Sequence, residues 1–157
     1  MMRCTAVCLL VILFLFGCSA PKDSQMSCKD LTLTLPEAYL DLSGEPYAED
    51  TDFLYGRERL IVLGLGEKKS DLEIYSLDAY TAQVLKGNAL ACALETVGNS
   101  YRFTYEAPVG DTVYSYVTGT YESPEYFWVV QCYCPTQYLE TYHQEISAIL
   151  DSVKINP

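Results

Sequence analysis

Four strand-like runs joined by short turns fill residues 90–134 and restrict the possible folds more than any other feature of the sequence. The runs are rich in aromatic and β-branched residues, many of which alternate with polar ones, as in strands with two different faces. They begin at Leu90, Tyr101, Val113 and Tyr126, with turn residues at Gly98-Asn99 and Ser123-Pro124. Strands joined by short turns pair antiparallel, so we expect a four-stranded meander. A two-residue Gly98-Asn99 turn would place Glu95 opposite Arg102.

Shorter patterns on either side of the meander complete the expected elements. Residues 31–35 alternate Leu and Thr and stop at Pro36, as a strand does, and the aliphatic run 59–65 predicts a central strand covered on both faces. Residues 76–86 predict a helix that Ser76 caps and Gly87 follows. Residues 136–153 predict an amphipathic helix that packs near Trp128, with an apolar stripe of Tyr138, Tyr142, Ile146, Ile149 and Val153. The predicted fold class is α+β, with a mostly antiparallel β-sheet covered by two main helices.

The N-terminus has the three parts of an export signal. A short positive segment ends at Arg3, thirteen uncharged residues follow over 4–16, and Leu15-Phe16-Gly17-Cys18 resembles a bacterial lipobox. The apolar segment is shorter than the roughly 20 residues of a membrane-spanning helix. The resemblance implies that residues 1–17 are removed and that Cys18 carries lipid. A plain secreted protein or an uncleaved anchor is the alternative.

These signals predict three parts of the chain: a signal peptide over 1–17, a lipidated tether over 18–28 and a single α+β domain over 29–157. The expected location is the extracytoplasmic face of the cell membrane, where the lipid anchor holds the protein. The full chain has a net charge of −11, and Arg3 is the only charged residue of the signal, so residues 18–157 are more acidic still. This acidity argues against nucleic acid as a partner, because nucleic acid requires basic patches.

Four cysteines remain after the signal and the lipid-bearing residue: Cys28, Cys92, Cys132 and Cys134. Four thiols in an exported domain allow three disulfide pairings, and free thiols are the alternative. Cys132 and Cys134 also form a C-x-C pair that could bind a soft metal or act as a redox dithiol. On a strand, however, both cysteines share the face of Trp128 and Val130, where buried cysteines serve as small apolar residues.

Other motifs are weak indications of chemistry. The Gly64 and Gly66 pair followed by Lys68 lacks the remaining residues of a phosphate loop, so a loop that ends a strand is the expectation. The acidic loop over 43–52 lacks the spacing of a calcium-binding loop. His143 is the only histidine, which argues against a His-based triad or a multi-histidine zinc site. We therefore expect no catalytic residues, no cofactor and no metal.

Fourteen tyrosines are the most unusual feature of the composition. Tyr101 and Tyr105 share one strand face, as do Tyr114 and Tyr116, which gives two pairs of aromatic side chains with polar tips. Tyrosine is favoured at interfaces because it combines a large ring with a hydroxyl. These four residues are a possible binding surface for a protein or a glycan, and burial in the core is the alternative.

Several segments resemble the PsbP-like α/β/α sandwich family. They are "LTLTLPEAYLDL" near the start, "SLDAYTAQVL" in the first helix, the meander, and the closing "YLETYHQEISAILDSVKI". The family includes a photosystem II subunit, a Ran-binding nuclear-import regulator and many bacterial lipoproteins without an assigned role. The resemblance implies a binding or assembly role and carries over no functional residue.

The predicted function is therefore a membrane-anchored, non-catalytic binding or accessory module with an unknown protein or glycan partner. The alternative is a thiol-redox or metal-handling envelope protein that uses Cys132 and Cys134.

Overall fold

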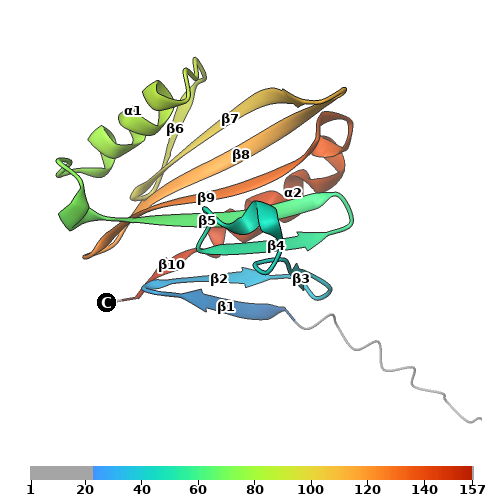
Figure 1. Cartoon of the computed structure of the whole chain (residues 1–157), viewed down its shortest axis with the longest axis horizontal. Helices are drawn as coiled ribbons and strands as arrows, with labels where there is room; N and C mark the ends of the chain where they lie inside the picture. Colours follow the sequence, from blue (N-terminus) through green and yellow to red (C-terminus); the bar gives the residue numbers. More distant parts are fainter. Residues whose placement is uncertain (1–22, 157) are drawn as a thin grey trace, which may run out of the picture.

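A computed structural model describes residues 23–156, which form two antiparallel sheets and two α-helices (Figure 1). The main sheet has the strand order β3-β4-β5-β9-β8-β7-β6. Its strands are β3 (Leu40–Asp41), β4 (Phe53–Arg57), β5 (Leu60–Lys68), β6 (Leu94–Val97), β7 (Ser100–Val109), β8 (Thr112–Glu122) and β9 (Tyr126–Pro135). The smaller sheet joins β1 (Ser24–Cys28), β2 (Leu31–Leu35) and β10 (Lys154–Ile155). The helices are α1 (Leu77–Gly87) and α2 (Leu139–Asp151), with short 3-10 turns η1 (Pro46–Ala48), η2 (Lys69–Asp71) and η3 (Thr136–Tyr138).

The predicted meander forms strands β6 to β9. Gly98 adopts a φ of 60°, which glycine tolerates, and the turn places Glu95 opposite Arg102 as expected. The ion pair itself differs from the expectation, because Arg102 Nη2 contacts Asp151 Oδ1 at 2.7 Å. A side chain as long as arginine can reach past its cross-strand neighbour to the end of α2.

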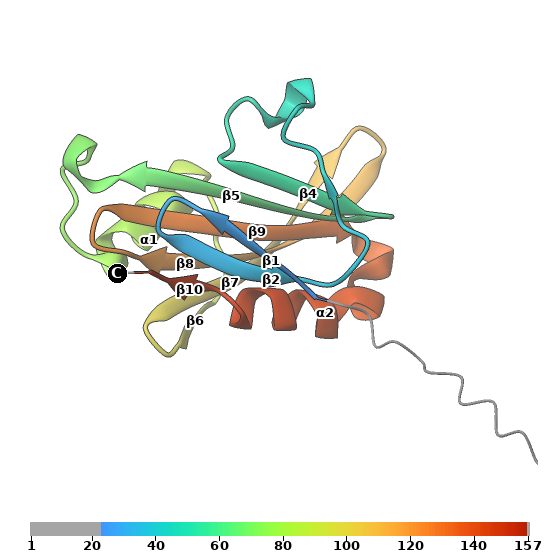
Figure 2. The same cartoon turned by 90° about the horizontal axis from the view of Figure 1, so that it is seen from below.

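Helix α2 and the small sheet pack on the same face of the main sheet (Figure 2). Of the predicted stripe, Tyr142, Ile146 and Ile149 are buried, while Tyr138 and Val153 are partly buried at its ends. The stripe meets the alternate β9 side chains Trp128, Val130, Cys132 and Cys134, together with the three leucines of β2. The expected contact between the closing helix and the Trp128 strand is therefore confirmed.

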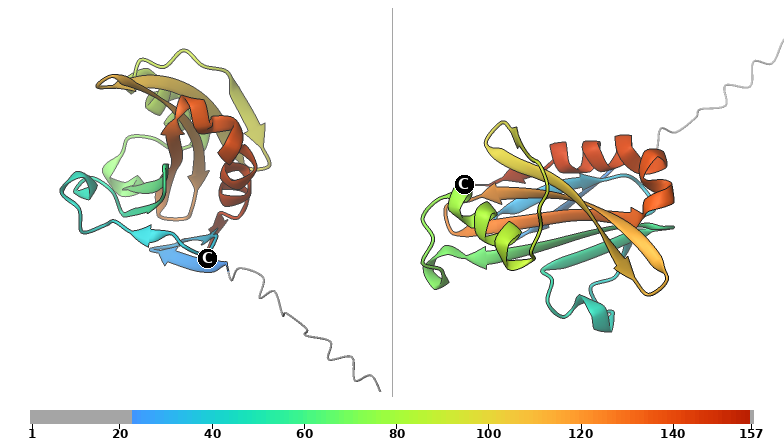
Figure 3. Two further views of the ribbon diagram at one scale, coloured as in Figure 1. Left: turned by 90° about the vertical axis from the view of Figure 1, so that its right-hand side faces the viewer. Right: turned by 90° about the horizontal axis from the view of Figure 1, so that it is seen from above.

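Helix α1 packs on the opposite face of the main sheet (Figure 3). Its N-cap is Ser76, whose Oγ accepts a hydrogen bond from the Ala79 backbone N–H. Tyr80 stacks on Phe127 of β9 with ring centroids 4.8 Å apart, and Thr81 shares a buried hydrogen bond with Thr120 of β8. These contacts lie at the start of β9 and the end of β8, so α1 covers only one end of its face.

The α+β class with a mostly antiparallel sheet and two main helices is confirmed, but several details differ from expectation. The strands divide into two sheets, since 31–35 leaves the main sheet and pairs with β1 and β10. Residues 24–28, expected in the tether, form β1 because their backbone groups pair along β2. The aliphatic strand β5 is fully covered on one face only; on its other face Glu67 accepts a hydrogen bond from Tyr80 of α1, while Leu65 is exposed.

The glycines of the G-x-G pattern lie inside β5 and do not form a loop that ends it. A Cβ atom on Gly64 would lie 2.1 Å from the Phe53 ring, and one on Gly66 would lie 2.9 Å from the Trp128 ring. The two glycines therefore make room for aromatic side chains of the core. Within residues 23–156, neither helix has the length and apolar character needed to cross a bilayer.

Candidate functional site: a groove lined by tyrosines

The end of the main sheet that α1 leaves uncovered carries a groove of about 590 Å³. Its floor crosses β5, β9 and β8, and its sides are the β4–β5 turn and the tip of the β7–β8 hairpin. We call it the tyrosine groove; it is lined by Glu58, Arg59, Ile61, Leu63, Val109, Tyr114, Tyr116, Gln131, Tyr133 and Pro135. The β7–β8 tip and the β4–β5 turn both lie at the right-hand end of the sheet in Figure 1.

A ladder of stacked tyrosines crosses three strands at the groove. Antiparallel pairing places Tyr105 opposite Tyr116, and Tyr116 opposite Tyr133. The ring centroids of these pairs are 4.9 and 5.2 Å apart, and Tyr114 meets Tyr133 edge-on at 6.1 Å. Direct cross-strand neighbours lie close enough for such stacking. All four rings are half-buried, so their edges form part of the surface.

Polar groups of the sheet hold the ladder in place. The Gln131 amide donates hydrogen bonds to Tyr105 Oη and Thr118 Oγ1, both at 2.9 Å. Burial raises the pKa of Tyr105, and burial together with the neighbouring Tyr105 and Tyr114 raises the pKa of Tyr116. These phenols are therefore neutral at physiological pH and can donate hydrogen bonds.

Two charged side chains stand at the β4–β5 turn. The Arg59 guanidinium lies over the Tyr138 ring, 4.6 Å from its centroid. The Glu58 carboxylate accepts a hydrogen bond from Tyr142 Oη at 3.1 Å. The groove thus combines aromatic edges, aliphatic side chains and one charge of each sign.

The structure joins three of the four predicted tyrosines and separates the fourth. Tyr105, Tyr114 and Tyr116 belong to the groove or its ladder, whereas Tyr101 packs beside α1 and donates a hydrogen bond to Asp78. Tyr133 and Gln131 also line the groove, but they were not among the residues predicted to form a binding surface. Alternation placed Tyr133 on the face opposite Cys132 and Cys134, but only the pairing register brings it beside Tyr116.

The four predicted cysteines lie in three separate places, and all four are free thiols. Cys132 and Cys134 are fully buried among the core residues, where burial raises the pKa of both thiols. Cys28 is half-buried, and burial followed by the nearby Asp52 carboxylate raises its pKa. Cys92 is half-buried in the segment between α1 and β6.

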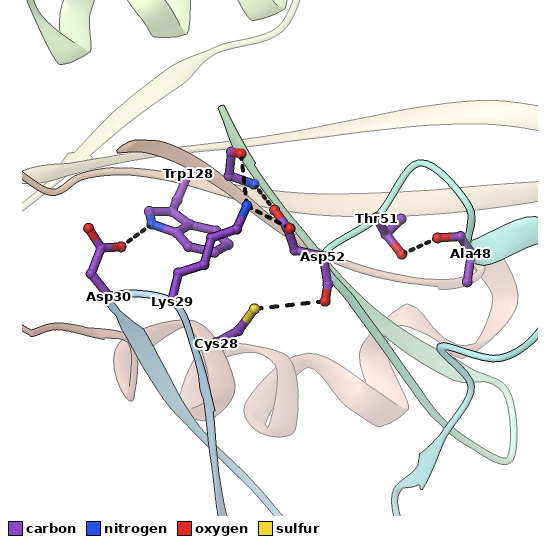
Figure 4. A network of polar contacts seen from close by, with 8 residues as sticks. Cys28, Lys29, Asp30, Ala48, Thr51, Asp52 and Trp128 are labelled. Carbon is purple, nitrogen blue, oxygen red and sulfur yellow. Dashed lines mark hydrogen bonds and ion pairs between the residues drawn. The ribbon is translucent and has the colours of Figure 1, made fainter. Parts of the chain in front are cut away.

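A second polar cluster joins the β1–β2 turn to the main sheet (Figure 4). Asp52 pairs with Lys29 at 2.7 Å and accepts a hydrogen bond from the Gly66 N–H, also at 2.7 Å. Asp30 accepts from the Trp128 indole N–H at 2.8 Å. The cluster acts as a brace between the two sheets, because its charged groups are engaged with one another. Within residues 23–156, no three His, Cys, Asp or Glu side chains gather as metal ligands would.

No family model and no curated protein matches the sequence, but solved structures match the fold. Cyanobacterial PsbP (CyanoP) from Synechocystis sp. PCC 6803 matches with a TM-score of 0.62 at 9% identity, covering 88% of this chain and 95% of that one. LpqN from Mycobacterium tuberculosis, a protein involved in cell envelope biogenesis, matches with a TM-score of 0.51 at 12% identity, covering 87% and 91%. A protein from Bacteroides thetaiotaomicron VPI-5482 has a TM-score of 0.54 at 10% identity, covering 82% of this chain and 46% of that one. The chain therefore has the PsbP-like fold, as the sequence resemblance implied.

Proposed function

We propose that this chain, which has the PsbP-like fold, is a non-catalytic binding module that holds a partner in the tyrosine groove. The observation that carries the proposal is the tyrosine ladder on the uncovered end of the sheet. The volume of the tyrosine groove falls within the roughly 300–1,000 Å³ that is typical of ligand-binding sites. Tyrosine and arginine are the residues that dominate binding energy at interfaces, and the groove offers both. The partner is a protein or a glycan.

The chemistry of the groove favours binding over catalysis. Its ionisable side chains are Glu58, Arg59 and the tyrosines, and the two charged ones are engaged with Tyr142 and Tyr138. A nucleophile requires an adjacent base within hydrogen-bonding reach. His143 lies on α2, outside the groove, and the buried thiols of Cys132 and Cys134 lie on the opposite face of the sheet.

The same burial argues against the thiol-redox alternative. A reactive thiol is exposed and has a lowered pKa, because the thiolate is the nucleophile and the metal ligand. Cys132 and Cys134 are inaccessible and have raised pKa values. Their surroundings therefore suit apolar packing.

The anchoring part of the proposal places the module on the extracytoplasmic face of the cell membrane, with lipid on Cys18. Residues 1–22, which carry the signal and Cys18, lie outside the described residues, so the support is the lipobox-like sequence. LpqN, described as acting in cell envelope biogenesis, is consistent with this location. Labelled fatty acid should enter the expressed protein, and Cys18→Ala should abolish the labelling; labelling that persists would exclude this anchor.

The groove is tested by photo-crosslinking in the native membrane. A photoreactive amino acid replaces Val109, which is 57% exposed at the groove, or Tyr75, which is 91% exposed and does not line it. The Val109 position should give a discrete adduct and the Tyr75 position should not. Tyr116→Ala should reduce the adduct about tenfold, the effect of losing roughly 1.4 kcal/mol of binding energy. Equal adducts from both positions, or insensitivity to Tyr116→Ala, would contradict the proposal.

A further inference from the structure

Strand β7 has an edge that its neighbour covers only in part. β7 is ten residues long, but β6 pairs with its first four residues alone, from Ser100 to Phe103. Residues 104–109 pair with β8 on one side and have no strand on the other. An uncovered strand edge presents a row of backbone donors and acceptors to a further strand.

The register shows which backbone groups point outward. A two-residue hairpin closes on a hydrogen-bonded pair, and bonded pairs then alternate along the strands. The closing pairs are Val97 with Ser100 and Val109 with Thr112. When bonded and non-bonded pairs are counted from either turn, Thr104 and Glu106 fall in pairs that are not bonded to β8. Their backbone N–H and C=O groups therefore point away from β8. Within residues 23–156, no other segment hydrogen-bonds these backbone groups.

A groove of about 380 Å³ lies between α2 and the β6–β7 pair and reaches the start of this edge at Thr104. Leu139, Ile146 and Leu150 of α2 supply apolar side chains, and Thr104 lines it from β7. Side chains of a strand alternate between two faces, so every second side chain of an added strand would point toward the α2 face. The free backbone groups and the groove are thus positioned to bind one extended segment together.

The charges beside the edge favour one kind of bound peptide segment. Glu95 and Glu106 are exposed on the α2 face of β6 and β7, and the chain as a whole has a net charge of −11. Arg102 does not offset them, because its guanidinium is paired with Asp151. A segment with apolar side chains for the groove and basic residues on either side therefore matches both the shape and the charge.

We propose that the exposed half of β7 is a strand-addition site for an extended, basic and apolar peptide segment of another protein. The groove beside this edge and the tyrosine groove lie on opposite faces of the sheet, although Val109 of the exposed half also lines the tyrosine groove. Addition to a sheet edge draws affinity from backbone hydrogen bonds and selectivity from alternate side chains. A second copy of this chain is a poorer occupant, because antiparallel pairing of two β7 edges would bring Glu106 carboxylates together and Pro108 lacks an N–H.

The probe is the capped peptide Lys-Val-Thr-Val-Thr-Lys, added in excess to the isotope-labelled protein. Amide hydrogen exchange should slow at Thr104 and Glu106, the two outward-facing N–H groups, whereas Tyr105, already bonded to β8, should change little. The same peptide with N-methyl groups on both valines should not protect them, because alternate backbone donors are lost. Absence of protection by the unmodified peptide would overturn the proposal, as would dimerisation through this edge without peptide.

A pair of variants separates the edge from general stability. Thr104→Pro removes one outward N–H on an edge that already tolerates Pro108, and it should weaken peptide binding at least about tenfold. Thr104→Val keeps the N–H and should bind as the parent does. Thermal melting of both variants monitors folding, and Tyr75→Phe, at an exposed position that lines neither groove, should leave peptide binding unchanged. Binding that survives Thr104→Pro in a folded protein would overturn the proposal.

Discussion

At the scale of single residues, neighbours in β9 have opposite surroundings. Cys132 and Cys134 face α2 and are fully buried, while Tyr133 between them faces the tyrosine groove. Alternation along a strand requires this separation, since successive side chains point to opposite faces. One short segment therefore contributes both to the core and to the candidate site, and its residues can be tested separately.

The thiols provide the prediction at this scale. With iodoacetamide at pH 8, the native protein should be alkylated at Cys92 and Cys28, which are half-buried, well before Cys132 and Cys134. The two core thiols should react only after denaturation, because they are inaccessible and their pKa values are raised. Mass spectrometry of the peptides measures the order. Rapid native labelling of both core thiols would instead support the thiol-redox alternative.

At the scale of elements, α2 is the main cover of the core. Ile146 and Ile149 are 2% and 1% exposed, whereas Gln144 is exposed to solvent. The 3.6-residue spacing of the apolar stripe predicted this orientation, and the short connection after β9 returns the helix over its own strand. The helix therefore contributes to stability through one face.

Truncation of that face should be costly. Ile146→Ala is expected to lower the free energy of unfolding by about 2–5 kcal/mol, since it removes buried methyl groups and leaves a cavity. The control Gln144→Ala should change it by less than about 0.5 kcal/mol. Urea unfolding curves measure both values, and equal midpoints would mean that the stripe is not buried.

At the scale of the whole molecule, tyrosines that are buried or half-buried link stability to alkaline pH. Burial raises the pKa of Tyr39, Tyr80 and Tyr121, and carboxylates that accept hydrogen bonds from Tyr39 and Tyr80 raise those two further. The unfolded chain releases these protons near pH 10 while the folded protein retains them. Their stabilising effect is thus complete below about pH 10 and is lost as the pH rises above it.

Urea unfolding between pH 8 and pH 11 should accordingly show a loss of stability that steepens above about pH 10, because the buried thiols of Cys132 and Cys134 add a loss that begins at lower pH. Tyr80→Phe removes one of the titrating groups, so the stability of this variant should fall less steeply with pH than that of the parent protein. Tyr75→Phe is the matched control, because Tyr75 is almost fully exposed. A stability that is constant across this range would contradict the assignment of these tyrosines as protonated in the folded protein.

The sequence by itself determined the class of fold and its main elements. The meander, the helix that follows Ser76 and the stripe of the closing helix depend on local alternation, capping and short turns, which act between neighbours in the chain. The same local information placed Tyr101 and Tyr105 on one strand face, and Tyr114 and Tyr116 on another. It also placed Cys132 and Cys134 on the face of Trp128.

Only the tertiary structure decided how these elements meet. The contribution of Tyr133 to the ladder depends on the β8–β9 register, and the separation of Tyr101 depends on where α1 packs. The small sheet forms because residues 24–28 pair with β2 and the chain returns as β10, a contact between the two ends of the domain. The free edge of β7 exists because β6 begins only at Leu94, opposite Phe103. These contacts depend on how whole strands and helices pair and pack, which the local alternation of side chains does not predict.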